Sequence, residues 1–166
     1  MTNTEIYDNL KKAFAEKIGD WHEQTGSEYM KRMSSYADVA DPGYIRDICL
    51  YLRDDKELGF DSLLNLSSVD NGDNTLSVVY HLEAREKKQH FALKVTVPAD
   101  NAIVPSVTGV WAHANWHERE AWDMMGIKFL GHPDMRRILL DEDWVGHPLR
   151  KEYKHPEFYR GMKVQY

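Results

Sequence analysis

Residues 63–97, LLNLSSVDNGDNTLSVVYHLEAREKKQHFALKVTV, decide the fold of this chain because their apolar residues follow the two-residue period of β-strands. Three strands are predicted, over residues 63–69, 76–82 and 91–97. The turn-rich residues 70–74 separate the first two strands, and the charged residues 85–88 separate the second from the third. Two short turns between three alternating runs predict an antiparallel meander.

Helices are predicted on both sides of the meander. Residues 4–18 carry apolar side chains at helical spacing, and the glycine that follows is expected to end this helix. A second helix, over residues 41–55, begins with an aspartate and a proline, which are typical of a helix start. After the meander, a third helix is predicted from Ser106 or Thr108 to Gly126, where glycine suits the left-handed backbone of a helix end.

Residues 28–40 give a more ambiguous pattern, in which Tyr29, Met33 and Val39 suggest an edge strand. Helices that pack on strands adjacent to them in sequence are typical of α+β domains. The predicted fold class is therefore α+β, an antiparallel β-sheet packed against helices, with an extended C-terminal tail.

Composition narrows the class of protein. A chain of 166 residues with 42% hydrophobic and 29% charged residues is typical of one globular domain with its own core. The first 20 residues are interrupted by charges, unlike a secretory signal, and no window approaches the roughly 20 apolar residues of a membrane span. We therefore expect a cytoplasmic protein whose membrane association comes through a partner. The net charge of −6 argues against binding to nucleic acid.

Cysteine content excludes two kinds of site. The chain has one cysteine, Cys49, so an internal disulfide is impossible, in agreement with a reducing compartment. An iron–sulfur cluster needs about four cysteine ligands, so we expect no cysteine-bound cluster in this chain.

Residues 141–166 differ in composition from the rest of the chain. They contain five acidic and five basic residues, so the whole net charge of −6 belongs to the first 140 residues. Prolines and glycines break any periodic pattern there, yet the segment keeps five aromatic residues, Trp144, Tyr153, Phe158, Tyr159 and Tyr166. We therefore expect one domain at residues 1–140, followed at 141–166 by an extended tail that becomes ordered against another protein.

Residues 116–153 carry the most specific motif, WHEREAWDMMGIKFLGHPDMRRILLDEDWVGHPLRKEY. It resembles the signature of the thirty-kilodalton (C-type) subunit of respiratory complex I. That signature runs E-R-E-x-aromatic-D-x-x-G-I-x-F-x-G-H-P-D-L-R-R-I-L, then an acidic pair, an aromatic residue and G-x-P-L-R-K. The matching residues are Glu118, Arg119, Glu120, Trp122, Asp123, Gly126, Ile127, Phe129, Gly131, His132, Pro133, Asp134, Arg136, Arg137, Ile138, Leu139, Glu142, Asp143, Trp144, Gly146, Pro148, Leu149, Arg150 and Lys151. Met135 stands where leucine is usual, and looser similarity extends over residues 40–153.

The resemblance implies a structural subunit without catalytic residues in the peripheral arm of NADH:quinone oxidoreductase (complex I). Its neighbours would be subunits of type D (forty-nine-kilodalton), which forms much of the quinone cavity, and of types B and I. The family subunit binds no cofactor; FMN, iron–sulfur clusters, NADH and quinone belong to the holoenzyme, which couples electron transfer from NADH to proton translocation. The implied location is the cytoplasmic side of the inner (plasma) membrane, peripheral and through the complex.

Charge is concentrated on the helix within this motif. Arg119 and Asp123 are four residues apart and can pair. Glu118 falls on an otherwise apolar stripe, so in a buried position it would need a partner such as Arg136 or Arg137. A network of salt bridges, within or between subunits, is favoured over a proton relay.

Two Gly-His-Pro sequences, residues 131–133 and 146–148, each precede an arginine. Because proline fixes its backbone angle, both are interpreted as rigid turns that aim arginines at carboxylates of a neighbouring subunit. The residues expected at a partner interface are Glu118, Arg119, Glu120, Asp123, Arg136, Arg137, Trp144, Arg150 and Tyr153. No catalytic, cofactor-binding or metal-binding residue is assigned.

Three alternatives remain open. The signature also resembles that of subunits of membrane-bound nickel–iron hydrogenases and of related F420- or ferredoxin-dependent complexes. A stand-alone zinc hydrolase could use His113, His117 and Glu118, since the histidines have the i, i+4 spacing of helical zinc sites. A properly spaced third ligand is missing, because residue 121 is alanine. A free-standing binding module would be a stable monomer with a dispensable tail.

Overall fold

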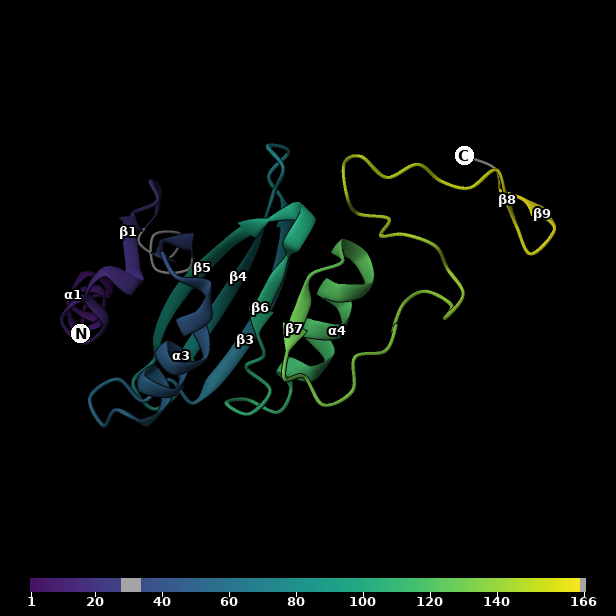
Figure 1. The fold of residues 1–166 in the computed structure, drawn as a ribbon. Helices are drawn as coiled ribbons and strands as arrows, with labels where there is room; N and C mark the ends of the chain where they lie inside the picture. The colour runs from purple at the N-terminus through teal and green to yellow at the C-terminus, as the bar shows by residue number, and fades with distance from the viewer. Residues whose placement is uncertain (28–33, 165–166) are drawn as a thin grey trace.

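The computed structural model describes residues 1–27 and 34–164, and its centre is a five-stranded sheet in the order β1-β2-β5-β4-β3 (Figure 1). The strands are β1 (Ile18–His22), β2 (Tyr36–Val39), β3 (Ser62–Asp70), β4 (Thr75–Ala84) and β5 (Gln89–Pro98). Strands β3, β4 and β5 are antiparallel neighbours, with Tyr80 of β4 opposite both Leu66 and Leu93. The predicted meander and the α+β class are confirmed.

The sheet is mixed because β2 runs parallel to β5, while β1 pairs antiparallel with β2. The prediction of an edge strand in residues 28–40 is wrong in this respect, since β2 lies between β1 and β5. Val39 belongs to β2, whereas Tyr29 and Met33 lie outside the described residues.

Helix α1 (Asn3–Phe14) is shorter than the predicted 4–18. Thr2 caps its start in a capping box with Glu5, which satisfies two free backbone N–H groups. The helix ends at Ala15, whose φ of 48° leaves the right-handed helical region, and a 3₁₀ turn leads directly into β1.

Gly19 lies in β1, so the prediction that it ends a helix is wrong. A Cβ atom on Gly19 would lie 2.8 Å from the Cβ of Asp38, so β1 and β2 approach too closely there for any side chain. The glycine permits strand pairing at this point.

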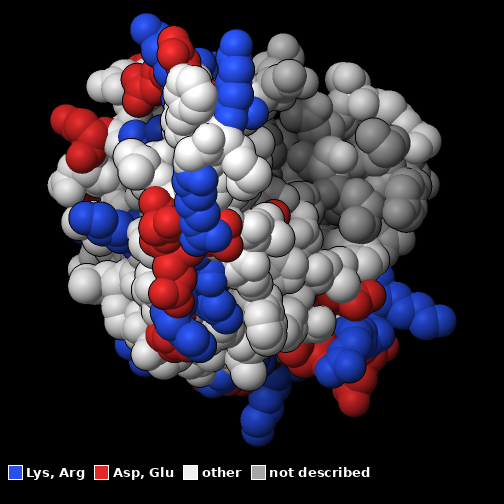
Figure 2. Space-filling view, turned by 90° about the vertical axis from the view of Figure 1, so that its right-hand side faces the viewer, with Lys and Arg blue, Asp and Glu red and all other residues white. Residues whose placement is uncertain are grey.

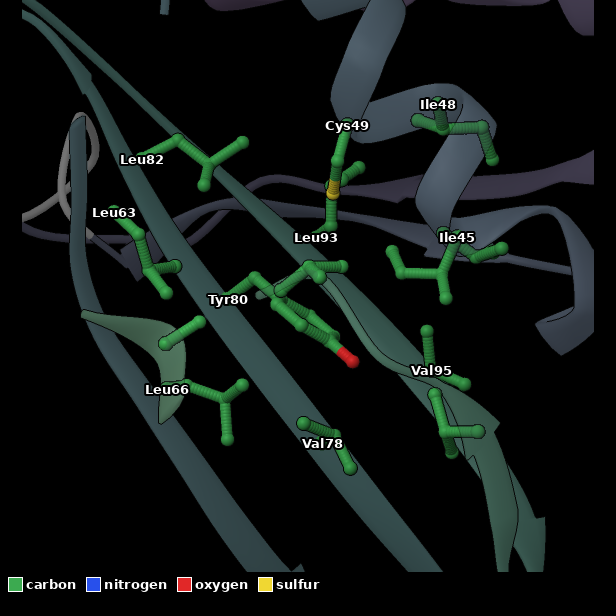
Figure 3. Close-up of a cluster of buried hydrophobic side chains, with 14 of the residues drawn as sticks. Ile45, Ile48, Cys49, Leu63, Leu66, Val78, Tyr80, Leu82, Leu93 and Val95 are labelled. Carbon is green, nitrogen blue, oxygen red and sulfur yellow. The ribbon is translucent and has the colours of Figure 1, made fainter. Parts of the chain in front are cut away.

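The second predicted helix is confirmed as a 3₁₀ turn, η2 (Pro42–Tyr44), followed by α3 (Ile45–Asp54). The Asp41 carboxylate accepts a hydrogen bond from the N–H of Gly43 at 3.0 Å, as expected for a capping aspartate. Figure 3 shows α3 lying across the sheet, with its buried residues directed at the apolar side chains of β4 and β5.

The core lies on one sheet face. Along β4 the alternate residues 76, 78, 80, 82 and 84 are buried, as are residues 91, 93, 95 and 97 of β5. Leu63 and Leu66 of β3 are both buried although they are three residues apart, because a bulge between residues 63 and 65 changes the register.

Helix α4 (Ala114–Met125) packs against β3, beside a two-stranded parallel sheet of β6 (Ile103–Pro105) and β7 (Lys128–Leu130). A short 3₁₀ turn, η3 (Ala99–Asn101), leads from β5 towards β6. The C-terminal segment, residues 141–164, extends to the side opposite α1 and ends in a small hairpin, β8 (Phe158–Tyr159) and β9 (Met162–Lys163) (Figure 1). Within residues 1–27 and 34–164, no helix has the length and apolar character to cross a membrane.

Candidate functional site

Helix α4 begins later than predicted and ends where predicted. Residues 106–113 form turns, and the helix starts at Ala114. Its C-cap is Gly126, with a left-handed φ of 76° and an N–H that donates to the carbonyl of Trp122 at 2.8 Å. These turns are held by a side chain of α4, which accepts hydrogen bonds from polar groups of the segment that precedes the helix.

That side chain is Glu118, which is fully buried. Its carboxylate accepts hydrogen bonds from the Ser106 hydroxyl and the Val107 N–H, both at 2.7 Å. Burial raises the pKa of Glu118 to about 7, against which these two hydrogen bonds act. The expectation that Arg136 or Arg137 would neutralise Glu118 is therefore wrong, and its role is to hold the turns before α4.

Arg119 does not pair with Asp123, contrary to the expectation. Its guanidinium donates to the backbone carbonyls of Arg136 and Arg137, each at 3.0 Å, and lies 5.2 Å from the ring centre of the exposed Trp116. Arg119 thus supports the segment that follows β7.

Asp123 is fully buried and organises the same segment. It pairs with Arg137 at 2.5 Å and accepts hydrogen bonds from three consecutive N–H groups, those of residues 138–140, at 2.8–3.1 Å. Burial would raise the pKa of Asp123, but the hydrogen bonds from residues 138–140 and Arg137 together lower it. Arg137 also donates to the carbonyls of Trp144 and Gly146, so its guanidinium acts within the chain.

Arg136 differs from its neighbour in sequence. It is exposed and forms an ion pair with Asp134, which is also exposed, at 2.7 Å. Glu120 is likewise exposed on α4. Of the charged residues predicted at an interface, Arg136 and Glu120 are thus the most accessible to a partner.

The C-terminal segment is held against the core up to Lys151. Arg150 donates to the carbonyls of Met125 and Ala99, at 2.7 and 3.1 Å. The N–H of Leu149 donates to the carbonyl of Met124, and the N–H of Lys151 donates to the Asp70 carboxylate. Two of the acceptors, the carbonyl groups of Met124 and Met125, stand at the end of α4, where carbonyl groups have no partner within the helix.

His147 is a positioning residue, whereas its sequence pattern indicates only a turn. Its Nδ1 lies 3.0 Å from the carbonyl of Asp123, and its ring packs on Gly126 so closely that a Cβ there would be 2.6 Å away. The second Gly-His-Pro sequence is the feature of the sequence from which this role of His147 could have been predicted. Its neighbour Gly146 is covered in the same way by the ring of Tyr153.

Beyond Lys151 the segment folds mainly on itself. Trp144 donates its indole N–H to the hydroxyl of Tyr153 at 3.0 Å, and its ring lies 4.7 Å from that of Tyr159. The Tyr159 hydroxyl donates to Asp141 and Asp143. Figure 2 shows the molecule from the right-hand side of Figure 1, where the C-terminal segment lies. Positive and negative side chains are interspersed along one band of this face, with uncharged surface beside it.

The hairpin and the preceding segment expose large apolar side chains. The exposed fractions are 61% for Phe158, 65% for Met162 and 83% for Val145. In an isolated chain such side chains meet water, so this surface is suited to contact with another protein.

The geometry of the histidines does not suit a zinc hydrolase. His113 uses Nε2 on the carbonyl of Leu63, and the rings of His113 and His117 are 6.4 Å apart. The carboxylate of Glu118 is hydrogen-bonded to Ser106 and Val107. In the described part of the chain, no three His, Cys, Asp or Glu residues are grouped to hold a metal ion.

Cys49 is also unsuited to chemistry. It lies fully buried on α3 among apolar side chains (Figure 3), and burial raises the pKa of its thiol well above its usual range. A nucleophilic cysteine needs an accessible thiolate, so Cys49 is a core residue.

Comparisons with known proteins point to one family. The model of the respiratory-chain NADH dehydrogenase 30 Kd subunit family matches residues 39–159. The C-type subunit of the NADH-quinone oxidoreductase of Chlorobium phaeobacteroides is 47% identical over 79% of this chain and 80% of its own length. That of Roseiflexus sp. is 42% identical over 92% of this chain and 84% of its length. The corresponding protein of Chloroherpeton thalassium is 50% identical, and the chain spans about half of its length.

Solved structures agree in fold. Nqo5, as the trypsin-resistant fragment (1-134), is 25% identical with a TM-score of 0.60 and covers 80% of this chain and 99% of that fragment. A chain of the membrane-bound sulfane sulfur reductase, an archaeal respiratory membrane complex, has a TM-score of 0.64 at 22% identity, over 91% of this chain and 85% of its own, and shows the fold alone. The family match covers α3, the β3–β4–β5 meander, α4 and most of the C-terminal segment, so the chain belongs to the family of 30-kilodalton (C-type) subunits of the respiratory-chain NADH:quinone oxidoreductase.

Proposed function

We propose that this chain is a non-catalytic structural subunit of the peripheral arm of NADH:quinone oxidoreductase. It would hold the quinone-reducing subunits in register while electrons pass from NADH to quinone and protons are translocated. The proposed neighbours are the subunits of types D, B and I, which with the remaining subunits carry the flavin, the clusters and the quinone site. The proposed location is the cytoplasmic side of the membrane, reached through the complex.

The observation that carries this proposal is the form of the C-terminal segment. It is bound to the core up to Lys151 and then presents a hairpin whose Phe158 and Met162 are exposed. An apolar surface on a segment with few contacts to its own core favours docking on another protein. The family match extends over this segment to residue 159.

A truncation tests the proposal. Deletion of residues 154–166 keeps every hydrogen bond between the segment and the core described above, so we expect an unchanged circular dichroism spectrum and a melting temperature within a few degrees of wild type. The truncated chain should no longer co-purify with the D-type subunit from membranes. Because the anchors at Arg137 and Arg150 remain, the loss would come from the hairpin.

A matched pair of variants controls for the loss of apolar surface. Phe158→Ser with Met162→Ser changes the hairpin, and Leu64→Ser with Val69→Ser changes exposed residues of β3. Only the first pair should reduce co-purification. Retention of the D-type subunit by the truncated chain would refute the docking role.

A second candidate comes from the likeness to the sulfane sulfur reductase chain. A related complex with another electron donor, such as a nickel–iron hydrogenase or an F420- or ferredoxin-dependent complex, would need the same scaffold. Co-purification of a flavin- and NADH-binding subunit with the native protein would favour NADH as the donor. A nickel–iron subunit in its place would favour the second candidate.

Two further measurements address the other classes of function. Metal analysis should find no stoichiometric zinc, and bound zinc would revive the hydrolase hypothesis. A free-standing binding module should run as a monomer in native membrane extracts, whereas a complex subunit should run with its partners.

A further inference from the structure

A groove of about 440 Å³ lies apart from the C-terminal segment, where three stretches of chain meet. We propose that this groove receives an acidic side chain of a neighbouring subunit, with Arg46 as its ion-pair partner. This inference rests on the proposed function and extends it, because it names a second contact surface and the chemistry of its partner.

The groove is built from segments that the fold fixes in place. Arg46 stands in the first turn of α3, and Ser106 and Thr108 lie between β6 and α4. Leu130 is the last residue of β7, and Pro133 follows that strand. A nitrogen of the Arg46 guanidinium lies 3.6 Å from the position that a Cβ on Gly109 would occupy. Because glycine has no side chain, there is free space between Gly109 and the Arg46 guanidinium.

Arg46 is the exception among the described arginines. The others donate to carboxylates or backbone carbonyls, namely Arg53, Arg85, Arg119, Arg136, Arg137, Arg150 and Arg160. Within residues 1–27 and 34–164, Arg46 is exposed and its guanidinium takes part in no hydrogen bond or ion pair. A guanidinium has five donors, so this one is open to a bidentate carboxylate.

The polar lining complements a carboxylate. Thr108 and Asn115 contribute a hydroxyl and an amide, and none of the described lining residues is acidic, on a chain whose net charge is −6. Glu118 is fully buried behind the Ser106 hydroxyl, so it does not face the groove as an exposed carboxylate. The local charge of the lining is thus opposite to that of the chain as a whole.

The rim indicates a protein rather than a small anion. Leu130 is 69% exposed, and Pro133 lies beside it in the lining. A partner segment with an acidic residue flanked by apolar residues would cover Leu130 and exclude water from the ion pair, which strengthens it. Two of the five acids of the chain's own tail, Asp141 and Asp143, are already bound by Arg160 and Tyr159.

The first test compares two charge reversals in the assembled complex. Arg46→Glu places a carboxylate in the groove, and Lys12→Glu makes the same change on the exposed face of α1, outside the groove. Both variants should fold with the circular dichroism spectrum of wild type. We expect Arg46→Glu to reduce the amount of D-type subunit retained at moderate salt about tenfold, and Lys12→Glu to leave it unchanged.

The second test changes the space and keeps the charge. Gly109 has no positive φ, and a Cβ there would meet Arg46 at ordinary contact distance, so Gly109→Met should fold. Its side chain would fill the groove and weaken assembly as Arg46→Glu does. Wild-type retention by both Arg46→Glu and Gly109→Met would overturn the inference.

The third test identifies the occupant. With p-benzoylphenylalanine at position 130, irradiation of the purified complex should link this chain to a peptide of another subunit that contains Asp or Glu. Reversal of that acid to arginine should restore assembly of the Arg46→Glu variant. A link to the chain's own tail or to a second copy would overturn the inference and leave the proposed function standing. Failure of the wild-type chain to co-purify with the complex would instead refute the proposed function.

Discussion

Glu118 and Asp123 are both fully buried on one helix, yet their pKa values move in opposite directions. Glu118 has two hydrogen-bond donors and no cation, so the cost of burying its charge dominates. Asp123 has three backbone donors and a guanidinium, which outweigh that cost. The two carboxyl groups differ in the number of donors that face them and in the depth of protein around them, which is greater for Glu118.

The raised pKa of Glu118 predicts a pH dependence of stability. Between its ordinary value of 4.5 and about 7, the folded state holds the proton more tightly than the unfolded state, so stability falls as pH rises through this interval. Glu118→Gln cannot ionise and should lack this component. Urea unfolding of both proteins at pH 5, 6, 7 and 8 should show wild type losing up to about 3 kcal/mol relative to the variant.

Comparison of wild type with Glu118→Gln cancels the titration of the histidines, which both proteins share. Parallel stability curves for the two proteins would show that Glu118 is ionised throughout this range. In that case the two hydrogen bonds from Ser106 and Val107 would be strong enough to offset burial.

The adjacent arginines provide a second test. Asp123→Asn removes the charge opposite Arg137, whose side chain is only 10% exposed, and an unpaired buried cation costs about 3 kcal/mol. Asp134→Asn removes the partner of Arg136, but this ion pair is exposed to water, so the loss of stability should be small. Denaturant unfolding should separate the two variants clearly. Equal losses of stability would mean that burial does not govern these pairs.

At the scale of elements, the end of α4 connects the domain to its C-terminal segment. Carbonyl groups that the last turn of a helix leaves free accept hydrogen bonds from His147, Leu149 and Arg150. Gly126 lets the chain leave the helix and gives the His147 ring a flat backbone to pack on. The helix end is thus both a terminus and a docking point.

Two glycines with similar backbone angles isolate that packing. Gly126→Ala places a methyl group 2.6 Å from the His147 ring at a φ of 76°, whereas Gly131→Ala has a φ of 83° and no atom within 4 Å. Both substitutions carry the left-handed strain of about 1–2 kcal/mol. Only Gly126→Ala adds the clash, so its melting temperature should fall several degrees further. Equal shifts would show that the His147 ring moves aside at little cost.

Strand periodicity predicted the meander well because β4 and β5 each bury one face. The same reasoning failed for β1 and β2. β2 has four residues, too few for a period to emerge, and β1 contains Gly19 and Asp20, which seldom favour strands. β2 pairs with β5, whose residues lie more than 50 positions away, and β1 pairs only with β2 within this sheet.

The contacts within the candidate site were harder to predict than the end of its helix. The motif lies within the residues that the family model matches, and Gly126 as the helix end is confirmed. The pairing of Arg137 with Asp123 and of Glu118 with Ser106 depends on how loops close around α4, which spacing along a helix does not encode. Arg46 carried no sequence signal, since an isolated arginine in a helix is most often a surface residue.

At the scale of the whole molecule, hydrogen bonds anchor the chain to its core up to Lys151, so we propose that the compact unit extends beyond the boundary predicted at residue 140. This boundary predicts the pattern of trypsin cleavage. Lys154, Arg160 and Lys163 are exposed, beyond the anchored part of the segment, so they should be cut first and leave a folded fragment that ends near Lys154. Mass spectrometry of early digests checks this, and first cuts in the turn at residues 85–88 would contradict it. In the assembled complex the same three sites should be protected.

The position of β2 between β1 and β5 also bears on how the chain is made. The ribosome releases residues in order, so β1 and β2 leave it well before β5, on which β2 aligns. The β3–β4–β5 hairpins close from neighbours in sequence, which is fast, whereas the β2–β5 pair must close a long loop. The amino-terminal part of the nascent chain therefore waits, with Ala37 and Val39 uncovered, until the meander supplies the strand that completes the sheet.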